Sequence, residues 1–268
     1  MKISILLENS ALCDRFECDH GLSVYVETEK HKILVDLGPN EKTLFNAEKM
    51  GIDLKAVDTV FLSHGHYDHS GGIMPFCGIN NSAPVYMRSN AAGDYYHDER
   101  YIGIDKAIVA LPQVKFVEGD TVIDGELSLF TGITGRRYWP ESNRVLSVKV
   151  GEDLVQDEFT HEQCVVVDSG KKLLVSGCAH NGILNILDRY KEIYGGYPDA
   201  VISGFHMMKQ TDYTPEEINT VEDTARELSK LDTVFYTGHC TGDKAFRIMN
   251  GIMKDNLRKI SSGLEFYI

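Results

Sequence analysis

The segment FLSHGHYDHSGG, residues 61–72, places three histidines and one aspartate within six positions, namely His64, His66, Asp68 and His69. The apolar stretch that leads into it, residues 57–63, has the composition of a buried strand. Polar side chains that follow the end of a strand can converge on one point, and imidazole and carboxylate groups are the ligands that cations such as Zn²⁺ prefer. We therefore predict a divalent-metal site here rather than a histidine-rich surface loop.

The composition is that of a soluble globular protein, with 43% hydrophobic and 25% charged residues among 268. The net charge of -13 argues against binding to nucleic acid or to an anionic membrane, because like charges repel. The N-terminal apolar stretch is too short and too acidic for a signal peptide, so we expect a cytoplasmic protein that acts on a small molecule. The six cysteines form no CxxC pair, and we expect free thiols.

The order of the predicted elements indicates an α/β fold in one domain, residues 1–268. Runs of apolar and β-branched residues predict strands over 2–8, 22–28, 31–38, 57–63, 83–87, 113–119, 127–132, 144–150, 199–204 and 232–238, and a hairpin over 164–177. Helical spacing and end signals predict helices over 40–51, 182–195 and 214–231. Two strand-rich blocks flanked by helices suggest two sheets packed face to face with helices outside.

The pattern H-x-H-x-D-H-x-G-G after an apolar strand resembles the signature of the metallo-β-lactamase superfamily. The resemblance implies a four-layer αββα sandwich that holds one or two divalent ions at the sheet edges, with zinc favoured over manganese or iron. It also implies that Asp36, in ILVDLG, orients metal ligands without binding metal, and that His239, in GHCTG, is a ligand rather than a loop histidine.

The remaining ligands fit that pattern less regularly. His161 best fills the place of a lone histidine before a strand pair, and Cys178, after LLVSG, stands where most members have a bridging aspartate. His180 has no counterpart in the standard pattern. Three geometries stay open: His180 replaces His161, or Cys178 takes the bridging place with His180 nearby as an acid, or both bind and His161 is structural. Cys178 is equally read as a buried thiol without a metal.

Two further groups are candidates for contact with the substrate. His206 follows the strand at 199–204, and by likeness to related phosphodiesterases it is a substrate-binding or proton-donating residue, the alternative being a plain loop histidine. Arg136 and Arg137 lie in the loop TGRRYWPESNRV, where paired arginines can bind phosphate or carboxylate. The alternative is a solvated loop that balances an acidic protein.

The set THEQ, SGCAHNGILNIL, SGFH and GHCTG is similar to a narrower branch, labelled dihydropterin-ribofuranosylaminobenzene phosphate synthase or metal-dependent hydrolase of the β-lactamase type. We expect a hydrolase in which a metal-activated water attacks a small, anionic ester or phosphoester, such as a pterin phosphate. Asp68 would ligate metal and orient the water or take its proton, and His180 or His206 would protonate the leaving group. The alternatives are a di-iron redox enzyme and a non-catalytic, metal-binding regulatory protein.

Overall fold

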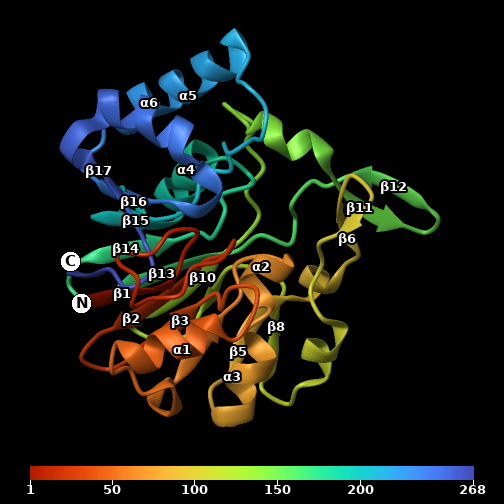
Figure 1. Cartoon of the computed structure of the whole chain (residues 1–268), viewed down its shortest axis with the longest axis vertical. Coiled ribbons are helices and arrows are strands. Elements are labelled where there is room, and N and C mark those ends of the chain that lie inside the picture. The colour runs from red at the N-terminus through yellow and green to blue at the C-terminus, as the bar shows by residue number, and fades with distance from the viewer.

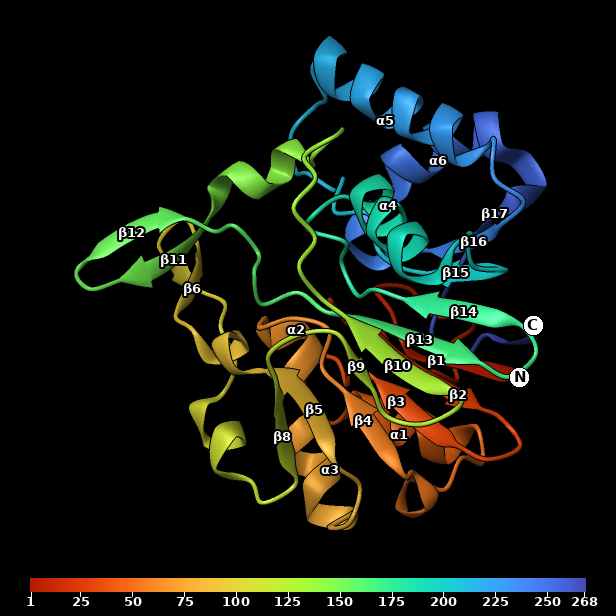
Figure 2. The ribbon, with the colours of Figure 1, turned by 180° about the vertical axis from the view of Figure 1, so that it is seen from behind.

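Two seven-stranded sheets pack face to face, with helices on both outer faces (Figure 1; Figure 2). The computed structural model describes residues 1–268. The first sheet has the order β18-β1-β2-β3-β4-β5-β8, with the bounds Glu265–Tyr267, Lys2–Leu7, Ser23–Glu27, Lys32–Val35, Thr59–Phe61, Val85–Arg88 and Val114–Val117. The second has the order β17-β16-β15-β14-β13-β10-β9, with the bounds Leu257–Lys259, Val234–Thr237, Ala200–Ile202, Lys172–Val175, Cys164–Asp168, Leu127–Phe130 and Thr121–Val122. This αββα sandwich confirms the predicted fold class.

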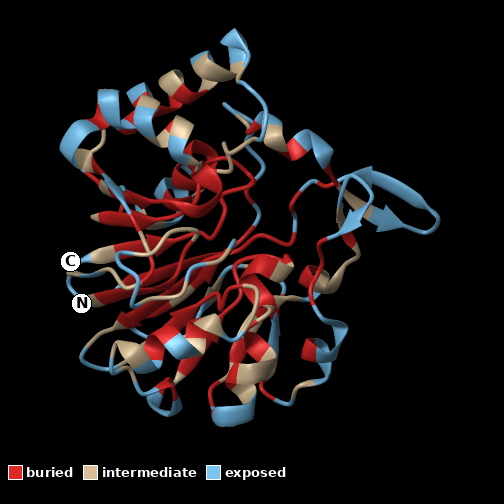
Figure 3. Ribbon diagram, viewed as in Figure 1, coloured by how far each residue is buried: buried red, intermediate tan, exposed pale blue.

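The alternation of side chains along each central strand fills two separate cores. In β13, Val165 and Val167 point into the core between the two sheets, while Cys164 and Val166 point into the core beneath the helices of the second sheet. Successive strand residues face opposite sides of a sheet, so a strand that is covered on both faces is apolar at every position. The buried interior of both sheets is visible in Figure 3.

Helices cover both outer faces of the sandwich. The first sheet carries α1 (Lys42–Lys49) and α3 (Ile73–Ile79), and the second carries α4 (Ile183–Tyr194), α5 (Pro215–Leu228) and α6 (Asp243–Met253), while the short α2 (Tyr67–Ser70) lies at the edge of the sandwich where β4 ends. Short 3₁₀ turns cover Leu54–Ala56, Ser89–Ala92, Lys106–Ala110, Glu141–Val145, His239–Thr241 and Lys254–Asn256. The predicted start of α5 is confirmed, because Thr214 and Glu217 form a reciprocal capping box. No helix has both the length and the apolar character that a membrane span requires.

A third, four-stranded sheet lies beside the sandwich. It has the order β12-β11-β6-β7, with the bounds Asp153–Gln156, Leu146–Val150, Tyr95–His97 and Arg100–Tyr101. The hairpin of β11 and β12 projects away from the molecule and is largely exposed (Figure 3). The chain that leaves β7 returns to the sandwich, where Gly103 forms an isolated antiparallel bridge with His66. The small sheet is therefore joined to the histidine-rich segment.

The topology brings several strand ends to one edge. β3, β4 and β5 are parallel, and β14, β15 and β16 are also parallel. Within each of these two groups the carboxyl ends of the strands therefore lie at the same end of the sheet. In the sandwich the carboxyl ends of both groups lie at one common edge. The segments that carry residues 64–69, Cys178, His180 and His239 leave strands at this edge, and His161 reaches the same edge because it precedes β13, which is antiparallel to β14. Residues more than 100 positions apart thereby come into contact.

Candidate metal centre

The loops that leave the strands at this edge contain an unusual backbone conformation. Asp36, Ala179, His206 and His239 have φ angles between 48° and 59°, in the left-handed region that residues other than glycine seldom adopt. Such a conformation costs about 1–3 kcal/mol for each residue and persists only where surrounding contacts enforce it. Four such residues at one edge mark a region that is built for something other than stability.

The first group of ligands consists of three buried imidazoles. Possible ligand atoms of His64, His66 and His180 lie within 4.8 Å of one another, and the Nε2 atom of each ring is buried without a hydrogen-bond partner. An unpartnered buried polar atom costs about 1–3 kcal/mol, so three together call for a common partner. A divalent cation satisfies all three at once, because neutral imidazole nitrogen is a preferred ligand.

Neighbouring side chains set which nitrogen of these rings carries the proton. Asn143 Oδ1 lies 3.0 Å from His180 Nδ1 and can only accept, so Nδ1 donates and Nε2 keeps its lone pair. Ser63 Oγ donates to Asp36 Oδ2 at 2.7 Å and therefore accepts from His64 Nδ1 at 2.8 Å. Burial lowers the pKa of His66 to about 3 and also lowers the pKa of His64 and His180. The three rings are thus neutral at neutral pH, the form that binds metal.

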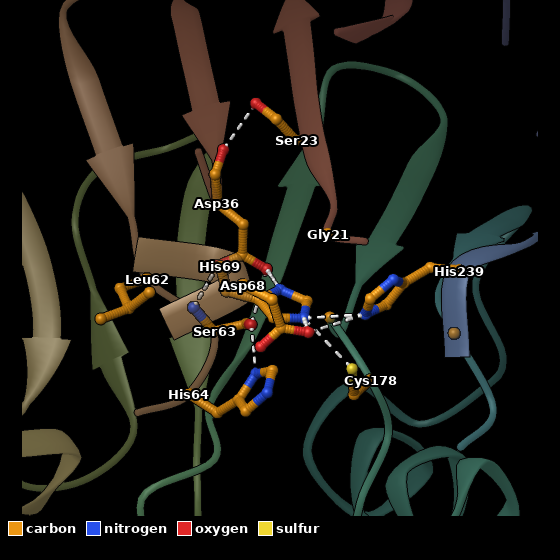
Figure 4. Close-up of polar contacts among 12 residues, drawn as sticks. Gly21, Ser23, Asp36, Leu62, Ser63, His64, Asp68, His69, Cys178 and His239 are labelled. Carbon is orange, nitrogen blue, oxygen red and sulfur yellow. Dashed lines mark hydrogen bonds and ion pairs between the residues drawn. The ribbon is translucent and has the colours of Figure 1, made fainter. Parts of the chain in front are cut away.

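The second group lies beside the first and consists of Asp68, His69, Cys178 and His239, which fall in three overlapping clusters of candidate ligands (Figure 4). His69 Nε2 lies 3.1 Å from Cys178 Sγ and 3.2 Å from His239 Nε2, and Asp68 Oδ2 lies 3.3 Å from His239 Nε2. The other nitrogens of these two rings face acceptors: His69 Nδ1 lies 2.6 Å from Asp36 Oδ2, and His239 Nδ1 lies 2.8 Å from Asn9 Oδ1. The Nε2 atoms of both rings, the thiol and the Asp68 carboxylate therefore converge, and they are the donor types that a divalent cation such as zinc prefers.

The ionisation of this second group follows from its charges. Burial opposes the charged forms of both His69 and Asp68, but the pKa of His69 rises to about 9 because Asp36 and Asp68 lie beside it. Conversely, His69 and His239 hold the pKa of Asp68 well below its ordinary value despite burial. Burial raises the pKa of the Cys178 thiol. The site thus already holds a negative charge opposite the imidazoles.

His161 has a different environment from the other histidines at this edge. Its Nδ1 atom accepts a hydrogen bond from the Gly65 N–H at 2.9 Å, and its Nε2 atom lies 3.0 Å from Asp157 Oδ2. Both ring nitrogens are therefore engaged by the protein, although His161 also falls in a candidate group with His66 and Asp157. The structure brings His180, and not His161, to the open lone pairs of the first group.

A cleft of about 330 Å³ opens onto both groups. It is lined by His20, His66, Tyr67, Asp68, His97, Arg100, Ser142, Cys178, His180, His206, Met208, Gln210, His239 and Cys240. His206 lies 4.1 Å from His180 between ring centroids, and its Nδ1 atom lies 2.8 Å from Ser142 Oγ. Burial lowers the pKa of His206 to about 3, so this ring is neutral at neutral pH.

The arginines predicted to bind substrate do not line this cleft. Arg136 pairs with Glu158 at 2.7 Å, and Arg137 pairs with Asp188 at 3.0 Å, so both belong to the surface loop described as the alternative. Neither Arg100 nor His97 is singled out in the sequence analysis; both are solvent-exposed residues that line the cleft. The sequence offers one weak signal for them, a charged HDER segment between two tyrosine-containing stretches.

Buried imidazole, carboxylate and thiol groups at the edge of an αββα sandwich define a centre of the metal-dependent hydrolase type. The chain belongs to the metallo-β-lactamase superfamily, whose family model matches residues 17–136. A solved structure, Tm1679, described as a metal-dependent hydrolase of the β-lactamase superfamily, is 30% identical with a TM-score of 0.85, and the match covers 100% of this chain and 99% of that one.

Two proteins of Methanocaldococcus jannaschii are also similar to this chain. The uncharacterized protein MJ0448 is 30% identical over 250 residues, which cover 91% of each protein. The 7,8-dihydropterin-6-methyl-4-(beta-D-ribofuranosyl)-aminobenzene-5'-phosphate synthase is 28% identical over 278 residues, which cover 92% of this chain and 90% of that protein. The likeness therefore extends over nearly the whole length of each.

Proposed function

We propose that the protein is a metal-dependent hydrolase that holds two divalent ions, zinc being the best fit, and acts on a small phosphoester or other anionic ester. The observation that carries this proposal is the convergence of three buried, unpartnered Nε2 atoms from His64, His66 and His180. The residues for a second ion are Asp68, His69 and His239, with Cys178 at 3.1 Å from His69 Nε2. The mixed nitrogen, oxygen and sulfur donors suit zinc.

Bound zinc supplies a Lewis acid and lowers the pKa of a coordinated water from about 15.7 towards 7. The protein's own part is to fix the ligands and to place an ionised carboxylate beside the reacting water. Asp68 is suited to that role because the pKa of its carboxyl is held low by His69 and His239, so that the group is ionised at neutral pH. It would accept a hydrogen bond from the attacking water and orient it.

His206 lines the cleft beside His180 and is placed to contact the substrate. The Ser142 hydroxyl donates to the carbonyl oxygen of His206 and therefore accepts from Nδ1–H, which leaves Nε2 as a hydrogen-bond acceptor. Because its pKa is about 3, His206 would accept a hydrogen bond from a substrate hydroxyl rather than supply a proton. Of the two roles expected for His206 from the sequence, substrate binding and proton donation, its low pKa and its contacts favour substrate binding.

The similarity to a pterin-phosphate synthase supports a phosphorylated substrate over a neutral one. The test is metal analysis of the purified protein, followed by a screen of phosphodiesters, phosphomonoesters and lactones. We expect close to two zinc ions per chain, loss of activity on chelation and recovery with zinc. Asp68→Asn should lower kcat by about 100-fold or more. Activity that survives both Asp68→Asn and exhaustive chelation would refute the proposal.

A further inference from the structure

Arg100 differs from the other cationic side chains around the centre. It is the one arginine or lysine that lines the cleft, and no carboxylate lies within ion-pair distance of its guanidinium. By contrast, Arg136, Arg137 and Arg144 all pair with acidic side chains. In a chain with a net charge of -13, an arginine left without an acid at the wall of a cleft is available to an external anion.

The backbone ties Arg100 to the metal-binding segment. Arg100 begins β7, and the chain that follows is bonded to the histidine-rich segment: the Tyr67 N–H donates to the Ile102 carbonyl at 2.9 Å, and Gly103 bridges to His66. The guanidinium carbon lies 5.9 Å from the centroid of the Tyr67 ring. The position of Arg100 relative to His66 is therefore set by short, local contacts and not by a free loop.

Two further polar side chains line the cleft with the guanidinium, and one of them, His97, has its Nδ1 atom 3.2 Å from the Asp98 carboxylate. His97 is the strand partner of Arg100 across the β6–β7 pair, and the Tyr67 side chain lies beneath the guanidinium. All three residues line the cleft. An imidazole, a phenol and a five-donor guanidinium suit the three outer oxygens of a phosphate monoester, and the planar fork of arginine can bind two of those oxygens at once.

We propose that Arg100, His97 and Tyr67 form a subsite for a terminal phosphate monoester that is distinct from the group hydrolysed at the metal centre. The inference rests on the proposed function, because it assumes that the reacting group of the same molecule lies at the metals. The substrate class is then a small molecule with two separated anionic groups. The metals hold the group that reacts, and Arg100 holds the phosphate that does not.

The test compares two nucleotides that differ by one phosphate, thymidine 5'-phosphate and thymidine 3',5'-bisphosphate. Each is titrated calorimetrically into the zinc-loaded, full-length protein. We expect the wild type to bind the bisphosphate about 10- to 100-fold more tightly, the range expected for a charge-assisted, bidentate arginine contact. In Arg100→Gln this ratio should fall to near one, and in Arg100→Lys it should be intermediate, because the charge remains and the fork is lost.

Arg136→Gln is the matched control, since it removes an arginine near the centre that already pairs with Glu158. It should keep the wild-type ratio, and zinc content measured on every variant excludes an indirect effect through the metals. No preference for the bisphosphate in the wild type, whether both nucleotides bind or neither does, overturns the subsite. So does a ratio that survives in Arg100→Gln. A preference that depends on Arg100 in a protein without ester hydrolysis supports the subsite and counts only against the proposed function.

Discussion

Replacement of Asp36 by asparagine tests the support beneath the metal centre. The Asp36 carboxylate is fully buried and accepts three hydrogen bonds: from the Ser63 N–H at 2.7 Å, from the Ser63 hydroxyl at 2.7 Å and from His69 Nδ1 at 2.6 Å. Asparagine must put an NH₂ group where one carboxylate oxygen now accepts. The less damaging choice is the Oδ1 position, where one bond is lost and a donor faces the Ser63 N–H.

The magnitude follows from these three contacts. One charge-assisted bond is lost outright and leaves a buried donor unpaired, while two others keep a neutral acceptor in place of an ionised one. The sum is a loss of about 3–5 kcal/mol in the free energy of unfolding of the metal-free protein. His69 also loses the anion that orients its ring, so metal affinity should fall about 10- to 100-fold.

Asp58 offers a matched control because its carboxylate accepts from the same three kinds of donor. His31 Nδ1 lies 3.1 Å away, the Lys32 N–H 2.7 Å and the Thr59 hydroxyl 2.8 Å, at a half-exposed position far from the cleft. Asp58→Asn should lower stability by about 1 kcal/mol and leave metal affinity unchanged. The assays are denaturant unfolding with a chelator present and competition for zinc against a chromophoric chelator. Wild-type zinc affinity in Asp36→Asn would show that Asp36 does not support the metal ligands.

The remaining predictions concern ligand choice, pH and backbone space. His180→Ala should lose about one metal equivalent per chain by elemental analysis, whereas His161→Ala should keep both ions and lose only stability; equal metal loss in the two would contradict the assignment. The pKa of His66 lies near 3 in the folded state and near 6.5 when unfolded, so protonation favours unfolding. The contribution of His66 to the stability of the metal-free protein should be complete above pH 6.5 and fall by about 1.4 kcal/mol per pH unit as the pH drops towards 3, measured by denaturant unfolding of wild type and His66→Ala. A Cβ at Gly71 would overlap a backbone carbonyl, so Gly71→Ala should cost about 2 kcal/mol or more, whereas Gly78→Ala, with open space around it, should be neutral or stabilising by thermal unfolding.

The parts of the structure that the sequence predicts are those encoded over short distances. The segment 61–72 predicts a cluster of metal ligands because the side chains are adjacent in the chain. The start of α5 is predictable because Thr214, Pro215 and Glu217 form a local helix cap. The apolar strands are recognisable because both of their faces are covered. Each of these signals lies within about twelve residues. The structure confirms the strands and the start of α5 and brings the ligand side chains of 61–72 together, while metal binding there stays a prediction.

The choice between His161 and His180 is of a different kind. Either histidine has the right ring, and what separates them is which nitrogen already has a partner. Gly65 and Asp157 occupy the ring of His161, while Asn143 binds only Nδ1 of His180 and leaves Nε2 open. Two of these three contacts span more than 30 residues, so no spacing rule reveals them. The position of Arg100 in the cleft cannot be predicted from the sequence for the same reason, because it depends on a small sheet that segments distant in the chain form.

The metal ligands are held ready by a chain of acceptors that reaches away from the cleft. Asp36 binds the Ser63 hydroxyl and His69, and that hydroxyl in turn fixes His64, so one carboxylate sets the proton positions of rings in both ligand groups. In the neutral His64 ring the bonded Nδ1 leaves Nε2 open, whereas in His69 a cation takes the place of the proton that the raised pKa keeps on Nε2. Without a cation the protein carries the cost of the unpaired Nε2 atoms of His64, His66 and His180. Metal binding removes this free-energy cost, because the cation pairs with the open nitrogens. The unpaired nitrogens that destabilise the metal-free protein are therefore also the source of its affinity for metal.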